Sequence, residues 1–210
     1  MAQNESSRER IIRTAISLFA ARGFRGTSIR DIAHAMNMSI SNIYHYFGNK
    51  EGLLVAILEH ASEQLVEPLS DVRSLDLPPV ERFRKLVETH LRLSQQNNDQ
   101  GKIFSLDEEH LSPEGEDINR RIQRAILDIY REELQELQQE GFAGERSITV
   151  LTFNVLGVIN WQLRWYRPEG PLSFQQVVDE IVSFVLYGVL GGPRDAGDGA
   201  QHRVSHGMGA

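Results

Sequence analysis

The chain concentrates short polar side chains in the segment 27–50, and their groups could form hydrogen bonds with a nucleic acid. At 100° per residue, the apolar residues of the segment 40–47 fall within about 60° of one another on a helix, so they mark its buried side. The opposite side carries Ser41, Asn42 and His45. Such polar groups can pair with base edges in a major groove. We therefore predict that these three residues face the bases of a duplex.

Further polar side chains flank that outward face, where a helix laid in a groove passes close to the phosphates. Lys50 opens the next helix, so it combines a cation with a helix N-terminus, and both favour a bound phosphate. The residues predicted to contact the DNA backbone are Ser28, Ser39, Tyr44, Tyr46 and Lys50.

Two short helices must position these side chains. Ser28 and Asp31 have the spacing of a capping box, which begins the first helix. Asn37 interrupts that helix, and Ser39 can cap a second one that runs to about Phe47. The pattern alone is equally compatible with an ordinary helical hairpin whose polar face is only hydrated.

Three segments resemble the DNA-binding signature of the TetR/AcrR family of bacterial transcriptional regulators: residues 19–23, 27–33 and 40–53. The resemblance implies a helix-turn-helix. One departure is that His45 and Tyr46 stand where the family more often has tyrosine and histidine, in that order. Which of the two contacts a phosphate is therefore left open.

Charge is divided unevenly along the 210 residues, whose formal net charge is −7. Residues 1–60 hold seven Lys and Arg against five Asp and Glu (+2), and the remainder holds fifteen against twenty-four (−9). An acidic C-terminal part is repelled by DNA and helps to orient the basic end toward it.

The absence of cysteine excludes disulfides and thiolate zinc sites. No apolar run approaches the roughly 20 residues needed to cross a bilayer, and the start does not look like a signal sequence. We expect a soluble cytoplasmic protein.

Helical periodicity recurs along the whole chain, with no convincing strand, so we predict an all-α fold of about nine helices. A long helix should join a DNA-binding domain to the rest, beginning at Lys50 and ending at Pro68 before a loop over 70–79. A short helix over 102–111 is ambiguous. The predicted domains are 8–48 for DNA binding, 49–191 for ligand binding and dimerisation, and a disordered tail at 192–210.

The last two predicted helices, within 146–166 and 177–190, are apolar on several faces. That is too much apolar surface for a small monomer, so we predict a homodimer with a four-helix interface. The alternative is that both helices fill the core of one chain.

The segment 161–173 resembles a TetR subgroup whose members often sense acyl-CoA thioesters. An apolar wall with a cation nearby suits an acyl chain that carries phosphates. The candidate ligand-binding residues are Phe104, Leu106, His110, Tyr130, Phe153, Asn160, Trp161, Arg164 and Trp165. The alternative is that the tryptophans belong to the core or a dimer interface, with Arg164 in a surface ion pair.

These features favour a dimeric repressor that binds a palindromic operator and is released by a small apolar or acyl-CoA-type effector. An activator, a co-repressor-dependent regulator and a ligand carrier without DNA binding are alternatives. An all-α enzyme is disfavoured because no nucleophile and base are assembled and there is no Gly-x-Ser-x-Gly pattern, while the one His-x-x-x-His spacing, His202 and His206, falls in the predicted tail. Clustered acids around Asp107, Glu109 and His110 are usually solvated, so we expect no metal and no cofactor.

Overall fold

A computed structural model describes residues 6–96, 111 and 113–191. The helix predicted over 102–111, the ligand candidates Phe104, Leu106 and His110, the acids Asp107 and Glu109, and the tail 192–210 lie outside the described residues, apart from Leu111. Every regular element in the described part is helical, which confirms the all-α prediction. The helices are α1 (Ser7–Arg22), α2 (Ile29–Ala35), α3 (Ile40–Phe47), α4 (Lys50–Arg73), α5 (Pro79–Gln96), α7 (Pro113–Gln139), α8 (Ile148–Trp165) and α9 (Phe174–Leu190).

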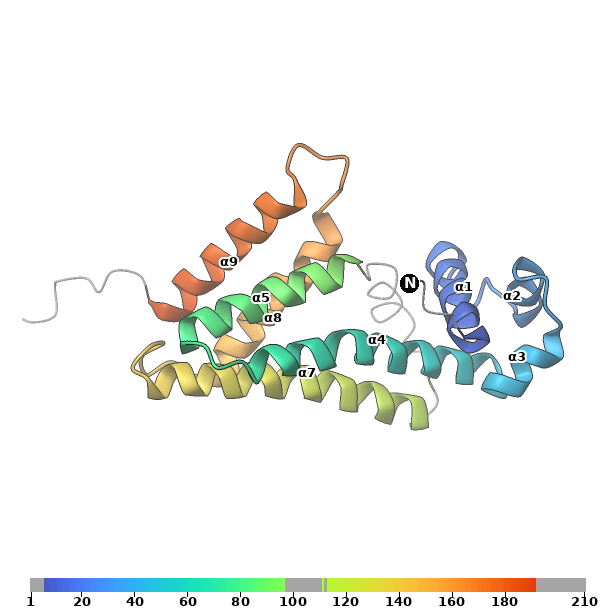
Figure 1. Ribbon diagram of the computed structural model, residues 1–210, viewed down its shortest axis with the longest axis horizontal. Coiled ribbons are helices and arrows are strands. Elements are labelled where there is room, and N and C mark those ends of the chain that lie inside the picture. Colours follow the sequence, from blue (N-terminus) through green and yellow to red (C-terminus); the bar gives the residue numbers. More distant parts are fainter. Residues whose placement is uncertain (1–5, 97–110, 112, 192–210) are drawn as a thin grey trace, which may run out of the picture.

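One end of the molecule is formed by α1, α2, α3 and the first two turns of α4, which together we call the head (Figure 1). Its core gathers apolar side chains from all four helices, including Phe19, Ile32, Ile43 and Leu54. Burying them offsets the conformational entropy lost by such short helices, which are marginal in isolation. The head is therefore held together by packing between helices.

The predicted caps of the head helices are present. Ser28 and Asp31 form a reciprocal capping box at the start of α2. The Ser39 hydroxyl accepts a hydrogen bond from the backbone N–H of Asn42 at the start of α3. Gly48 follows α3 with a φ of 72°, a conformation that side chains rarely tolerate. These local bonds determine where the two short helices begin and end.

The long helix α4 does not end at Pro68, as the sequence had predicted, but runs on to Arg73. Proline in a helix interior removes one backbone hydrogen bond and costs about 3 kcal/mol. The next turn compensates, because Leu69 and Val72 are buried in the core of the second half of the molecule. The Ser70 hydroxyl also donates to the Val66 carbonyl at 2.9 Å. The predicted loop over 70–79 is correspondingly shorter.

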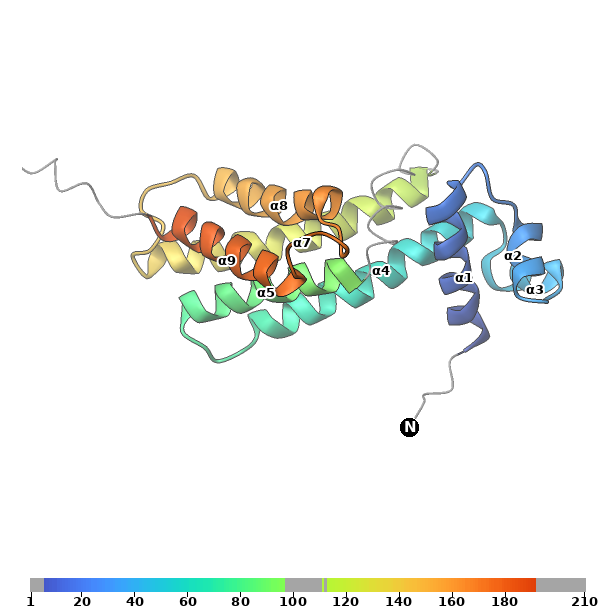
Figure 2. The ribbon, with the colours of Figure 1, turned by 90° about the horizontal axis from the view of Figure 1, so that it is seen from above.

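The remaining helices, α5, α7, α8 and α9, pack with the second half of α4 into what we call the body. Figure 2 shows α8 and α9 beside each other, over α5 and α7. Both α4 and α7 run lengthwise from the head toward the far end of the body (Figure 1). Because α4 contributes to both cores, any tilt of this helix moves the head relative to the body.

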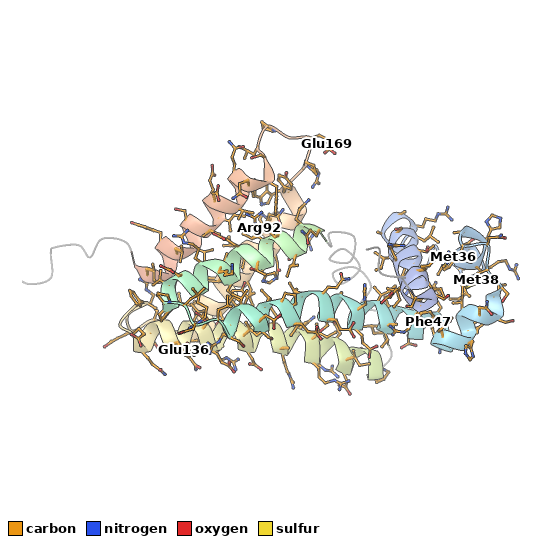
Figure 3. The ribbon with its side chains drawn as sticks, in the orientation of Figure 1. Met36, Met38, Phe47, Arg92, Glu136 and Glu169 are labelled. Carbon is orange, nitrogen blue, oxygen red and sulfur yellow. The ribbon has the colours of Figure 1, made fainter. Side chains whose placement is uncertain are left out.

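At the far end of the body, arginines from two helices converge on glutamates of α7. Arg82 donates through Nε to Oε2 of Glu133 at 2.9 Å, and Arg73 lies 3.4 Å from the same carboxylate. Glu136, labelled in Figure 3, pairs with both arginines. Glu133 is fully buried, and this burial raises its pKa while the hydrogen bond from Arg82 opposes the rise. The cluster ties α4, α5 and α7 together.

Among the described residues, no helix is long and apolar enough to span a bilayer.

Candidate DNA-binding and effector-binding surfaces

The outward face of α3 carries the residues that the sequence predicted to read bases. Ser41, Asn42 and His45 are exposed, while Ile43 and Phe47 on the opposite side are buried. The two flanking tyrosines also remain accessible, with Tyr44 48% and Tyr46 45% exposed. The structure thus brings all the α3 candidates to one polar surface of the head.

The two serines predicted to contact the backbone already serve as helix caps. The Ser28 hydroxyl donates to Oδ2 of Asp31 at 2.5 Å, and this hydrogen bond lowers the pKa of the Asp31 carboxyl. The Ser39 hydroxyl accepts from the Asn42 amide at 3.3 Å. Both serines are exposed at the start of their helices. A phosphate contact by either one would therefore add to an existing structural role.

Lys50 is placed differently from the other candidates, because its ammonium is directed into the head. Its Nζ donates to the Phe24 carbonyl at 2.5 Å and lies 4.1 Å from the centre of the Phe24 ring. These contacts tie the turn after α1 to the start of α4. Its predicted phosphate contact stays a prediction, beside a positioning role that the sequence did not indicate.

A glycine determines how closely α4 approaches α3. A Cβ atom at Gly52 would lie 2.1 Å from the Phe47 carbonyl oxygen, closer than any side chain allows. The Gly52 amide is capped by the Asn49 side chain at 2.7 Å. Because α3 is anchored this tightly to α4, a movement of α4 is passed directly to the reading surface.

Arg8 is a further cation of the head that was not among the residues predicted to contact DNA. Its guanidinium carbon lies 5.7 Å from the centre of the Phe47 ring, so α1 places a cation beside the end of α3. Arg8 is exposed. The positive balance of residues 1–60 was the available signal, but charge counts do not say which cation lies near the reading helix.

Among the ligand candidates that the structure describes, Tyr130 alone lies in the body core. It is fully buried, and its hydroxyl lies 3.0 Å from Nδ1 of His90 on α5. Burial lowers the pKa of His90 to about 4 and raises that of Tyr130. Both groups are therefore neutral near pH 7. His90 was not among the predicted ligand residues, because only packing makes it a partner of Tyr130.

A second polar group of the body core was also missed. Gln162 on α8 is fully buried and donates through Nε2 to the Gln95 side chain on α5 at 3.2 Å. Its Oε1 has no hydrogen-bond partner among the described residues. A buried amide oxygen left without a donor is unfavourable, so this atom marks a point inside the body that could accept a hydrogen bond from a ligand.

The other ligand candidates within residues 113–191 are exposed and lie on α8, outside the body core. Trp161 is 62% exposed, and the Arg164 guanidinium lies 5.8 Å from the centre of its ring. The other exposed candidates are Phe153, Asn160 and Trp165. The structure does not bring these residues together with Tyr130.

Large apolar side chains stay exposed along both α8 and α9. On α8, positions 150, 153, 157 and 161 recur every three or four residues, so they form one stripe along the helix. The exposed apolar residues of the two helices are Val150, Phe153, Trp161, Trp165, Phe184 and Tyr187. An apolar surface of this kind marks an interaction site.

Two domain families match the chain. Residues 11–57 match the family described as bacterial regulatory proteins, tetR family, and residues 76–189 match a tetracyclin repressor-like C-terminal domain. The HTH-type transcriptional repressor KstR2 of Mycobacterium tuberculosis is 26% identical over 193 residues, covering 89% of this chain and 94% of the relative.

Solved structures with similar folds span nearly the whole chain as well. AibR, in a complex with isovaleryl coenzyme A and operator DNA, is 29% identical, with a TM-score of 0.77 over 88% of this chain and 100% of that one. The TetR family regulator PfmR from Thermus thermophilus is 28% identical, with a TM-score of 0.78 over 85% and 98% of the two chains.

Proposed function

Because the chain belongs to the TetR family and is therefore a ligand-responsive transcriptional regulator rather than an enzyme, we propose that it represses as a homodimer on a palindromic operator. The observation that carries this proposal is the exposed polar face of α3. Ser41, Asn42 and His45 read bases in the major groove. Ser28, Ser39, Tyr44, Tyr46 and Lys50 contact the phosphates, as the sequence predicted.

The exposed stripes of α8 and α9 support dimerisation. Two copies of each helix would form a four-helix interface and remove Trp161, Phe184 and Tyr187 from water. This accounts for Phe153, Trp161 and Trp165 better than a place in an effector pocket, since they lie outside the body core. A symmetric dimer also presents two reading helices, as two half-sites require.

The effector that we propose is a small apolar molecule, most simply a coenzyme A thioester. The relative AibR was solved with isovaleryl coenzyme A, and its structure covers 88% of this chain. Inside the body, Tyr130, His90 and the unpaired oxygen of Gln162 offer neutral hydrogen-bonding points within an apolar core. Such sparse polar groups fix the orientation of an apolar ligand.

The position of α4 suggests how effector binding would release the protein from its operator. This helix belongs to both cores and is locked to α3 through Gly52. An effector that prefers a body with a tilted α4 would change the spacing of the two reading helices. A decisive switch requires the ligand to prefer that state by about 5.5 kcal/mol. The site of action is the cytoplasm, where the operator lies.

Footprinting of the DNA upstream of its own gene tests the proposal. The wild-type protein should protect a palindrome there, and Asn42→Ala should weaken its binding by about 1–3 kcal/mol because one base contact is lost. Gln135→Ala removes an exposed amide from α7 in the body and serves as the matched control. If no palindrome is protected, or if both variants bind like wild type, the reading role of α3 is wrong.

A further inference from the structure

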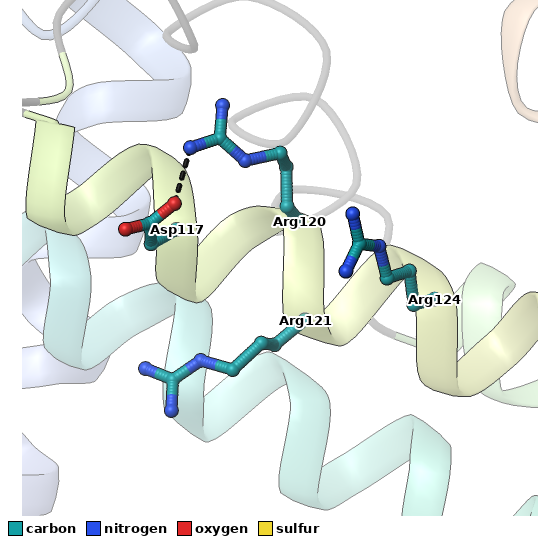
Figure 4. A pocket seen from close by; sticks show the side chains of 4 residues that line it. All are labelled: Asp117, Arg120, Arg121 and Arg124. Carbon is teal, nitrogen blue, oxygen red and sulfur yellow. Dashed lines mark hydrogen bonds and ion pairs between the residues drawn. The ribbon is translucent and has the colours of Figure 1, made fainter.

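Three arginines form a cationic stripe, Arg120, Arg121 and Arg124, on the outer face of α7. Together with Asp117 they line a shallow depression of about 400 Å³ (Figure 4). Their spacing of three and four residues places them on one side of the helix. All three are exposed.

The stripe is only partly neutralised. Arg120 pairs with Asp117 one turn earlier and lies 3.4 Å from Glu116. Within the described part of the chain, Arg121 and Arg124 form no ion pair. Like charges one turn apart destabilise a helix, so stability alone does not explain this arrangement. It is also unusual in its surroundings, because residues 61–210 carry a formal net charge of −9.

The position of the stripe gives it access to the head. Leu111, just before α7, packs against the head core. In the first turn of α7, a Cβ at Gly115 would lie 3.1 Å from the Leu111 side chain and 3.4 Å from Val55 of α4. The stripe follows this close contact by one to three helical turns. A displacement of this part of α7 would therefore also displace α4 and the head.

We propose that the cationic stripe binds the phosphate groups of a nucleotide-bearing effector, of the kind that coenzyme A thioesters carry. This inference rests on the proposed function, and it adds the place where the charged part of the effector is held. The planar guanidinium groups of Arg121 and Arg124 can each donate paired hydrogen bonds to phosphate oxygens. Arg120, held by Asp117, adds positive charge beside them. Bound phosphates would then bear on α7 next to its contact with α4.

Calorimetric titration of the intact protein with coenzyme A, pantetheine and inorganic pyrophosphate tests the stripe. Coenzyme A should bind the wild-type protein, and the double variant Arg121→Gln/Arg124→Gln should bind it at least about tenfold more weakly because charge-assisted hydrogen bonds are lost. Pantetheine, which lacks the phosphates, should bind more weakly than coenzyme A and equally to both proteins. Arg131→Gln is the matched control, since Arg131 lies on α7 but pairs with Asp128 at 3.1 Å.

Three results would overturn the proposal. The first is equal binding of coenzyme A by the double variant and the wild type, or no binding by either. The second is pyrophosphate binding as tight as that of coenzyme A, which would make the ligand a free polyphosphate. The third is a loss of operator affinity in the ligand-free double variant, which would assign the stripe to DNA. A wild-type protein that binds coenzyme A through the stripe but no operator would instead refute the proposed function.

Discussion

The head and the body both expose aromatic side chains, but of different types and among different neighbours. On α3, the exposed aromatic residues are tyrosines, set among serine, asparagine and histidine. On α8 and α9 they are mostly tryptophan and phenylalanine, set among other apolar groups. A tyrosine hydroxyl can donate to a phosphate at a hydrated surface, whereas an indole or phenyl ring gains most by leaving water. The comparison separates a surface suited to DNA from one suited to a second copy of the chain.

Because the two surfaces lie on separate cores, a substitution should destabilise the body without altering the exposed face of α3. The buried ion pair between Arg82 and Glu133 offers the largest expected effect. Glu133→Ala leaves Arg82 without its buried partner. We expect a loss of about 3–5 kcal/mol in the free energy of unfolding of the body. Urea unfolding followed by tryptophan fluorescence measures it, because both tryptophans of the chain, Trp161 and Trp165, lie on α8.

Glu132→Ala is the matched control for that measurement. Glu132 is 61% exposed and lies 3.6 Å from Arg73. Exposed ion pairs contribute about 0–1 kcal/mol, so this variant should unfold nearly like wild type. If both variants lost the same free energy of unfolding, the burial of Glu133 would not account for the stability that its ion pair contributes.

Acid should weaken the body through His90, whose partner Tyr130 lies in the same core. The pKa of His90 falls from 6.5 to about 4 on burial, so below pH 6.5 the unfolded chain binds a proton that the folded chain does not. Stability therefore falls as the pH drops from 6.5 toward 4, by about 3 kcal/mol in total from this group. Unfolding free energies measured across that range give the slope.

Replacing the histidine checks the origin of this slope. His90→Gln keeps a polar side chain but cannot titrate, so the pH dependence between 6.5 and 4 should flatten by that amount. Gln135→Ala, at an exposed site on α7 without a titratable group, is the control and should keep the wild-type slope. A slope unchanged in His90→Gln would contradict the assignment.

The apolar surface of the body should be the interface, and a charge placed on it tests this. Phe184 is 65% exposed in a single chain. In a symmetric dimer, Phe184→Glu introduces two carboxylates at once, and we expect dimerisation to weaken by roughly 2–4 kcal/mol. Analytical ultracentrifugation measures the dissociation constant. Gln139→Glu adds the same charge at an exposed site on α7 and should leave the dimer intact.

The smallest expected effect comes from removing one tyrosine hydroxyl from the exposed face of α3. Tyr44→Phe keeps the ring and removes only the hydroxyl, so operator affinity should fall by about 0.5–1.5 kcal/mol, the net worth of one hydrogen bond. Tyr187→Phe makes the same change on α9 and should leave operator affinity unaltered. Fluorescence anisotropy with the footprinted operator measures both. If Tyr187→Phe lost more operator affinity than Tyr44→Phe, the assignment of α3 to DNA and of α9 to the dimer interface would be contradicted.

Local sequence signals predicted the head well. The capping box of Ser28 and Asp31 and the cap at Ser39 join residues only three positions apart, so they form wherever the chain begins a helix. The outward face of α3 followed from helical periodicity alone. Helix boundaries and facing directions of this kind depend on near neighbours, and near neighbours are visible in a sequence.

The sequence by itself therefore determined the helical class, the caps and the polar face of α3. Only the tertiary structure decided that α4 continues through Pro68, that the Lys50 ammonium turns inward, and that His90 meets Tyr130. Each of these outcomes depends on partners far away in the chain: His90 and Tyr130 are 40 residues apart, and Arg73 and Glu136 are 63 apart. Periodicity shows that a side chain will be buried, but packing between distant helices decides what it is buried against.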